Sequence, residues 1–252
     1  SVAGQKDGDD PVAHRIGIVK FSGEKSDSIG NTTYEEGILF TQTYNHTQVL
    51  KELTDVTTGA KQLKNSVNSL KAAGCTSADY GMEKAADILK DRKGDDANRP
   101  AVVIMFTDGE PNRDSGYDKA VAGAAVKAAK GLKDKGIKVY TIGMFGDANQ
   151  SDTNNKFNQY MHGVSSNYPN AVNDKNSSSG VNLGTRASGN YYFAAANAGE
   201  LDKIFQSIGQ EVSSLKLDVG TDTVLSDTLS SYFELNAPEG AENSGITVMM
   251  AN

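Results

Sequence analysis

The run of residues 101–107, with the sequence AVVIMFT, constrains the fold of this chain more than any other segment. Its apolar residues do not alternate with polar ones, and the dipeptide Arg99-Pro100 separates it from the preceding segment. An apolar strand without alternation is typical of a parallel sheet that is buried on both faces. We therefore predict a central strand here, in a sheet that helices cover on both sides.

Strand and helix patterns alternate along the rest of the chain up to Ser214. β-prone runs predict strands over residues 15–21, 37–43, 137–143 and 191–193. Apolar residues at helical spacing predict helices over residues 59–72, 117–134 and 154–161, one from the 74–81 segment to Lys90, and one that opens at the capping box 197–200. This order predicts an α/β fold over residues 1–213: a doubly wound, mostly parallel sheet with helices on both faces. Beyond it, β-prone runs at 215–219 and 232–235 predict that residues 214–252 begin a separate β-rich module.

Composition excludes several classes of function. The net charge of -7 and the acidic pI near 5.0 disfavour nucleic acid and anionic membranes as partners. The longest strongly apolar stretch, residues 101–106, is far shorter than the ~20 residues that span a bilayer. Cys75 is the single cysteine, and His14, His46 and His162 lack metal-ligand spacing. The sequence also contains no Gly-x-Gly-x-x-Gly, Gly-x-Ser-x-Gly or phosphate-binding loop with Lys, so we do not expect an enzyme.

Two segments place polar groups where ligands bind in such folds, at the carboxyl ends of the strands. One is the loop around Thr76, which precedes a helix, and the other is the turn Asp108-Gly109-Glu110, which ends the most apolar strand. An acidic residue just past a buried strand needs a partner in space. A divalent cation, a backbone nest and a lysine are all compatible with this pattern.

Four segments together resemble a von Willebrand factor A domain. Their order and separations fit that family over about residues 12–213; they are residues 15–22, 74–82, 102–109 and 138–143. Residues 160–169, 191–193 and 201–205 resemble the A domains of Gram-positive cell-wall-anchored proteins and pilus-tip adhesins, and residues 224–233 resemble the entry to the β-sandwich modules that follow such domains. The resemblance implies an extracellular, cell-wall-anchored surface protein that binds an extracellular host or matrix protein.

The family's metal ion-dependent adhesion site gives specific residues a role. The resemblance implies that Thr76 and Asp108 are metal ligands for Mg²⁺, or for Ca²⁺ or Mn²⁺, and that an acidic residue of the partner completes the shell. Asp79, Glu110 and Asn112 would lie behind the ligands or face the partner. Asp79 also fits a role as the acidic residue of a helix cap at Thr76, and the residues after Asp108, including Arg113, also fit a solvated loop.

One departure from the family pattern limits these expectations. No Asp-x-Ser-x-Ser run follows an apolar strand, and the nearest match, residues 218–222, follows a polar segment. The resemblance implies that the family's first strand and helix lie before Ser1, leaving the strands 15–21 and 101–107 on either side of a gap. We therefore expect metal binding by this chain to be weak or absent. The alternative function is a metal-free structural or protein-interaction spacer in a surface protein or pilus, and the role of the Tyr- and Asn-rich region 146–193 stays open.

Overall fold

The computed structural model describes residues 5–7, 10–12, 14–24, 33–36, 41–94, 99–113 and 116–214. The chain divides into a unit of residues 1–217 and a second unit of residues 218–252. The predicted β-rich module 214–252 lies outside the described residues, apart from Ser214 itself. Within the described ranges, no helix is both long and apolar enough to cross a membrane.

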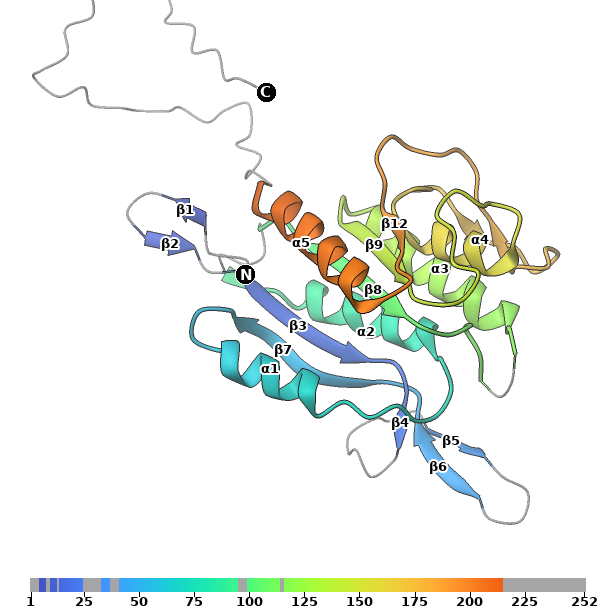
Figure 1. Ribbon diagram of the computed structural model, residues 1–252, viewed down its shortest axis with the longest axis horizontal. Helices are drawn as coiled ribbons and strands as arrows, with labels where there is room; N and C mark the ends of the chain where they lie inside the picture. The colour runs from blue at the N-terminus through green and yellow to red at the C-terminus, as the bar shows by residue number, and fades with distance from the viewer. Residues whose placement is uncertain are drawn as a thin grey trace, which may run out of the picture. The chain divides into compact units, whose positions relative to one another are not determined.

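A three-stranded parallel sheet forms the centre of the first unit. It has the order β12 (Tyr192–Ala194), β9 (Lys138–Gly143) and β8 (Val102–Thr107), as Figure 1 shows. β8 and β9 lie within the predicted runs 101–107 and 137–143, while β12 begins and ends one residue later than the predicted strand 191–193. The parallel direction and the surrounding helices confirm the predicted α/β class.

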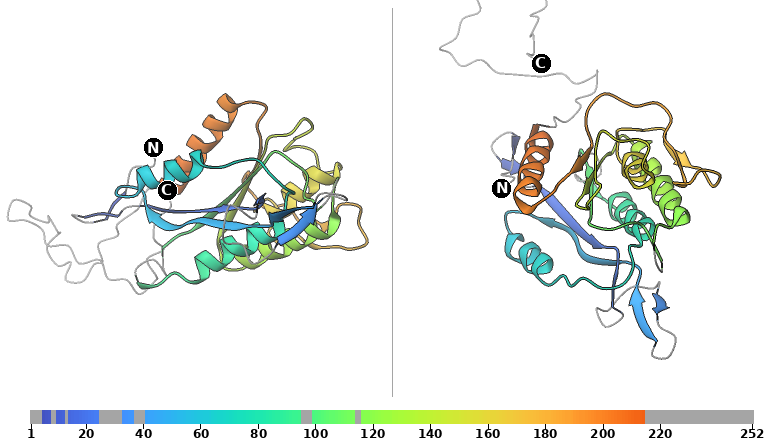
Figure 2. Two further views of the ribbon diagram at one scale, coloured as in Figure 1. Left: turned by 90° about the horizontal axis from the view of Figure 1, so that it is seen from below. Right: turned by 45° about the vertical axis from the view of Figure 1, so that its right-hand side comes forward.

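Helices lie on both sides of the strands. On one side are α2 (Ala78–Lys90), α3 (Lys119–Lys133) and α4 (Lys156–Val164), while α1 (Ala60–Asn68) and α5 (Ala198–Ser214) lie on the other, as Figure 2 shows for α1, α2, α3 and α5. Asp118 begins α3 by accepting hydrogen bonds from the backbone N–H groups of Ala120 and Val121.

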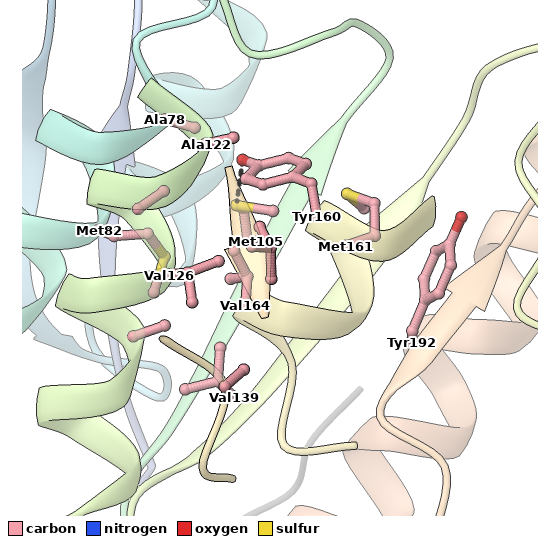
Figure 3. Close-up of a cluster of buried hydrophobic side chains, with 14 of the residues drawn as sticks. Ala78, Met82, Met105, Ala122, Val126, Val139, Tyr160, Met161, Val164 and Tyr192 are labelled. Carbon is pink, nitrogen blue, oxygen red and sulfur yellow. Dashed lines mark hydrogen bonds between the residues drawn. The ribbon is translucent and has the colours of Figure 1, made fainter. Parts of the chain in front are cut away.

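The larger hydrophobic core lies beneath α2, α3 and α4. Figure 3 shows Met82, Val126 and Tyr160 from these three helices close to Met105 and Val139 of the sheet. The Tyr160 hydroxyl donates a hydrogen bond to the sulfur of Met105, 3.5 Å away. Burial of each large side chain of this kind contributes roughly 1.5–3 kcal/mol of stability.

The opposite face of the sheet is covered unevenly. Tyr140 and Ile142 of β9 are fully buried against Ile208 of α5. In contrast, Ile104 and Phe106 of β8 remain 37% and 39% exposed. The lack of alternation in β8 predicted that helices cover both faces of this strand. On this face, however, α5 covers β9 and β12, and Ile104 and Phe106 of β8 stay exposed.

The sequence predicts only one of the two strands of a second, antiparallel sheet. Its two strands are β3 (Arg15–Lys20), which the sequence predicts, and β7 (Gln48–Asp55), which it does not. The sequence of β7, QVLKELTD, mixes charged residues with apolar ones and has no clear strand pattern. This strand forms by pairing with β3, whose residues lie 28 to 40 positions earlier in the sequence, and local patterns cannot show such a pairing.

Short strands also form outside the predicted strand runs. The predicted strand 37–43 reaches the structure only in β6 (Gln42–Asn45), which pairs with β4 (Gly23–Glu24) and β5 (Thr33–Glu36); residues 37–40 lie outside the described part. Two further hairpins join β1 (Gln5–Asp7) to β2 (Asp10–Val12) and β10 (Val172–Asn173) to β11 (Val181–Asn182).

The parallel sheet and the β3–β7 sheet share no backbone ladder. Among the strands that the structure describes, β3 pairs with β7 alone and β8 pairs with β9 alone. The helix α2 packs against α3 and also against β3 and β7, so it joins the two sheets on one side.

Candidate metal-binding edge of the sheets

The loop before α2 connects the ends of β3 and β8. The backbone N–H of Ser77 donates to the carbonyl oxygen of Phe21, just past β3, over 3.2 Å. Thr76 makes two hydrogen bonds with Asn112: its N–H donates to Asn112 Oδ1 at 3.1 Å, and its carbonyl accepts from the Asn112 N–H at 3.0 Å. The sequence placed Thr76 and Asn112 in separate segments, and the structure brings them into contact.

The turn after Asp108 also comes close to Thr76 at this edge. A Cβ atom at Gly109 would lie 3.3 Å from the Thr76 hydroxyl oxygen, so the turn after Asp108 passes directly beside that hydroxyl. The buried Thr107 side chain holds this turn by accepting from the Gly109 N–H and donating to the Gly109 carbonyl. Because side chains alternate along β8, Asp108 follows the buried Thr107 onto the exposed surface.

The side chain of Asn112 supports the turn rather than pointing freely outward. Besides accepting from Thr76, it donates through Nδ2 to the carbonyl of Glu110 at 3.1 Å. Asn112 therefore fixes the distance between the two loops that carry Thr76 and Asp108. Glu110 is half-buried beside it.

Asp79 lies in the first turn of α2 but does not act as part of a side-chain cap. Ser77 is the N-cap residue, and no side-chain capping hydrogen bond forms there. Asp79 is 4% exposed and forms an ion pair with Arg113, while its other oxygen, Oδ1, is buried without a hydrogen-bond partner. Burial raises the pKa of Asp79, and the Arg113 guanidinium opposes that shift.

Arg113 joins three parts of the chain at this edge. Its guanidinium carbon lies 4.5 Å from the centre of the Tyr80 ring, and its Nη1 lies 3.4 Å from Nδ1 of His46. His46 also contacts Ser77, with 2.7 Å between Nδ1 and the hydroxyl oxygen. Burial and the neighbouring Arg113 lower the pKa of His46 to about 4, so the ring is neutral at pH 7.

Sequence reasoning missed the part that His46 plays. A lone histidine between polar residues gave no signal, because its neighbours Ser77, Tyr80 and Arg113 are more than 30 positions away. The only signal in the sequence for this group of contacts was the position of Arg113, five residues after Asp108.

The donors present suit a hard cation but form an incomplete set. Thr76 and Asp108 offer a hydroxyl and a carboxylate, the oxygen ligands that Mg²⁺ prefers. In the ranges covered by the structure, no three His, Cys, Asp or Glu side chains converge as a metal-binding group. Mg²⁺ takes about six oxygen ligands, so the remaining positions would go to water or to other donors.

The α/β layers and the loops that meet at the carboxyl edge define a domain of the doubly wound class. The chain belongs to the von Willebrand factor type A domain family, which it matches over residues 2–206. Domains of this family are generally protein-interaction or adhesion modules, often metal-dependent, and typically not enzymes.

No curated protein matches the chain. Among solved structures, the chain is similar to proximal thread matrix protein 1 from the mussel byssus, with 16% identity and a TM-score of 0.41, over 66% of this chain and 32% of that one. The chain thus spans about a third of that protein.

Proposed function

We propose that this domain is a metal-dependent adhesion module of a bacterial surface protein. A divalent cation, Mg²⁺ in the first place, is held in part by Thr76 and Asp108 and binds an acidic residue of an extracellular host or matrix protein. The observation that carries this proposal is the contact between the Thr76 hydroxyl and the turn after Asp108, at the carboxyl edge of the sheets.

The chemistry of these two ligands suits an adhesive role. One neutral hydroxyl and one carboxylate leave one of the two positive charges of a divalent cation uncompensated, so the ion still attracts a further carboxylate. Asp108 is exposed and Glu110 is half-buried, which leaves this edge open to a partner. Asn112 positions the two ligand loops through its bonds to Thr76.

The remaining protein ligands are proposed to lie outside this sequence. We infer that a strand upstream of Ser1 in the parent polypeptide supplies them, and that the parent is a cell-wall-anchored or pilus-tip protein. Support comes from the missing Asp-x-Ser-x-Ser run and from the resemblance of residues 160–169 and 201–205 to Gram-positive surface proteins.

Calorimetric titration with Mg²⁺ tests the metal site. We expect weak binding by the 252-residue chain and at least about tenfold tighter binding, a gain of about 1.4 kcal/mol, by the longer parent polypeptide. Asp108→Ala should abolish binding in the longer form and Thr76→Val should weaken it. Asp87→Ala, which removes an exposed carboxylate on α2, is the matched control and should have no effect.

Absence of heat in both forms, or equal affinity in the Asp108→Ala variant, would contradict the metal mechanism. The second candidate function, a metal-free interaction or spacer domain, would then account better for the fold. One observation favours it: the Thr76–Asn112 and Asp79–Arg113 contacts hold the loops in place without an ion. Partner binding that survives chelation by EDTA would identify that function.

A further inference from the structure

The β10–β11 hairpin packs closely on the first turns of α3. Gly180 has a positive φ of 73°, and a Cβ atom there would clash with the carbonyl oxygen of Lys119, so the backbone at this position has no room for a larger residue. The side chain of Asn173 occupies the space over Gly123 of α3. The Lys119 ammonium donates a hydrogen bond to the carbonyl of Lys175, 3.0 Å away. Contacts at both ends of the hairpin and at its turn therefore hold it on the helix.

A cavity opens between this hairpin and the helix. It measures about 390 Å³, and it is lined by Lys119 and Ala120 of α3 and by Asn173 and Lys175 of the hairpin. We name it the lysine pocket. Ligand sites in proteins range from about 300 to 1,000 Å³, so the lysine pocket suits a group of the size of one or two amino-acid side chains. Its two lysines bring apolar methylene stems as well as positive charge to the wall.

The positive charge of the lysine pocket is not matched by an ion pair. Within the described residues, neither Lys119 nor Lys175 pairs with a carboxylate. An ammonium group has three donors, and the bond to the Lys175 carbonyl uses one of those on Lys119. The nearest acidic residues in the sequence, Asp118 and Asp174, accept hydrogen bonds from the backbone N–H groups that follow them. These carboxylates stabilise local turns and leave the two ammonium groups able to bind a ligand.

Lys156 adds a third positive charge beside the same hairpin. Its ammonium nitrogen lies 4.7 Å from the centre of the Tyr117 ring, and the Tyr117 hydroxyl donates at 2.7 Å to the carbonyl of Ser179 in the hairpin turn. Lys156 also has no ion pair with a carboxylate in the part of the chain that the structure covers. Three lysines thus gather around one hairpin in a chain whose net charge is -7. A basic site of this kind attracts an acidic partner and orients it.

The lysine pocket lies near the candidate metal-binding edge. The backbone N–H of Asp118, the residue before Lys119, donates to the carbonyl of Pro111 at 2.8 Å. Pro111 follows Asp108 by three residues. Because consecutive Cα atoms are about 3.8 Å apart, Asp108 and Lys119 lie within roughly 20 Å of each other. An extended peptide rises about 3.3 Å per residue, so about six residues of a partner span this distance.

We propose that the lysine pocket is a second subsite for the acidic partner, in which Lys119 and Lys175 bind a carboxylate of that partner. This deepens the proposed function and rests on it. One acidic residue binds the cation at Asp108, and another, up to about six residues away in an extended segment, enters the pocket. Glutamate suits the pocket because its methylene groups pack on Ala120 and on the lysine stems while its carboxylate reaches the ammonium groups. The partner segment is therefore rich in acidic residues, which Lys156 also attracts.

The charge of the chain favours a short acidic protein segment over a long polyanion. A nucleic acid or a sulfated glycan carries charge along its whole length and is bound by an extended stripe of basic residues. Here the lysines surround one small cavity, and the net charge of the chain is negative. A long polyanion would therefore meet repulsion beyond the hairpin, whereas a segment of a few acidic residues would not.

An NMR titration of the isotope-labelled 252-residue chain in EDTA tests the lysine pocket without the cation. The probe is a hexaglutamate peptide, and hexaglutamine is the neutral comparison. We expect hexaglutamate to shift the amide signals of Lys119, Ala120, Asn173 and Lys175, with an affinity that falls at least about threefold between about 50 and 200 mM salt because salt screens the charges. Hexaglutamine should cause no shift. Because EDTA removes divalent cations, hexaglutamate binding by a chain that fails to bind Mg²⁺ would overturn the metal mechanism and support the lysine pocket.

Two kinds of variant separate the pocket from general attraction between charges. Lys119→Gln/Lys175→Gln should weaken hexaglutamate binding at least about tenfold. The matched control, Lys64→Gln/Lys127→Gln, removes the same charge from exposed lysines on α1 and α3 and should change the affinity less than about twofold. Ala120→Phe keeps every charge but fills the cavity, and it should weaken binding at least about fivefold.

Four results would overturn the proposal. If hexaglutamate causes no shift, there is no acidic subsite at the hairpin, even where the chain binds Mg²⁺. Equal losses of affinity in the two double variants would mean that hexaglutamate responds only to the overall charge. Undiminished binding by the Ala120→Phe variant would mean that the ligand does not enter the cavity. A heparin oligosaccharide that displaces hexaglutamate and binds at least about tenfold more tightly would make a polyanionic glycan the ligand of these lysines.

Discussion

At the scale of single residues, His162 shows how burial changes the chemistry of a side chain. It is 1% exposed, and the rings of Tyr168 and Tyr192 lie edge-on to it at 5.5 and 5.0 Å. The Asn167 amide donates a hydrogen bond to its Nδ1 at 3.0 Å, which a protonated ring could not accept. Burial, with a smaller contribution from Arg186, lowers the pKa of His162 to about 4.

This shift predicts a loss of stability in mild acid. Between pH 6.5 and about 4 the unfolded chain binds a proton at this residue and the folded chain does not, so the free energy of unfolding falls as the pH falls. Over this pH range, His162 should account for about 2–3 kcal/mol of the fall in the free energy of unfolding. His162→Gln keeps an acceptor for Asn167 and does not titrate. Urea denaturation at pH 7, 5.5 and 4.5 should therefore show that the free energy of unfolding of this variant depends less on pH. His46 should account for much of the dependence that remains. Identical slopes in the two proteins would show that the folded state protonates this ring freely.

At the scale of elements, one lysine holds the end of α4. The Lys133 ammonium donates to the carbonyls of Gly163, Ser165 and Tyr168 at 2.7, 3.2 and 3.0 Å, where the helix ends and the following loop turns away. Helix ends leave carbonyl groups without intrahelical partners. Lys133 thus ties α3 to the last turn of α4.

Removal of this lysine should destabilise the fold by about 2–3 kcal/mol, because three carbonyls lose their hydrogen-bond donor. Lys133→Met tests this by urea denaturation, with Lys130→Met as the matched control three positions away. Lys130 makes an exposed pair with Asp134 in the same helix, and its loss should cost about 0.5 kcal/mol or less. Similar losses of stability in the two variants would mean that the hydrogen bonds from Lys133 to the end of α4 contribute no more than the exposed ion pair of Lys130.

Elements with a local pattern were predicted well, and those defined by distant pairing were not. The predicted helix 117–134 and strand 137–143 match α3 (Lys119–Lys133) and β9 (Lys138–Gly143), because their periodicity reflects burial that the structure confirms. The predicted helix 59–72 extends beyond α1 (Ala60–Asn68), since Val67 and Leu70 repeat at helical spacing but remain exposed. The strand β7 was missed because only its pairing with β3 defines it.

At the scale of the whole molecule, the candidate site also combines residues that the sequence predicted with distant contacts that it could not predict. The resemblance assigned Thr76 and Asp108, and the fold brings their loops into contact. It could not show that Asp79 pairs with Arg113, because the two lie 34 positions apart and their contact depends on how α2 docks against the turn after β8. Which carboxylate is buried is a property of packing, and packing is set by the complete fold.

We therefore expect Arg113 to stabilise the whole first unit of the chain rather than one turn. It connects the turn after β8 to Asp79 and Tyr80 of α2 and to His46 before β7, and so links the parallel sheet with the antiparallel one. Arg113→Met leaves Asp79 as a buried carboxylate without its cation, and we expect the free energy of unfolding to fall by about 2–4 kcal/mol.

The double variant Arg113→Met/Asp79→Asn decides whether the ion pair is the cause. Removal of the stranded charge should restore much of the lost stability, so urea denaturation of the single and double variants should give a strongly non-additive cycle. Arg186→Met removes an exposed arginine that lies 5.9 Å from the Tyr168 ring and should cost about 1 kcal/mol or less. Additive losses in the cycle would mean that Arg113 stabilises the protein by its packing on Tyr80, and that the two sheets are held together by α2 without the buried pair.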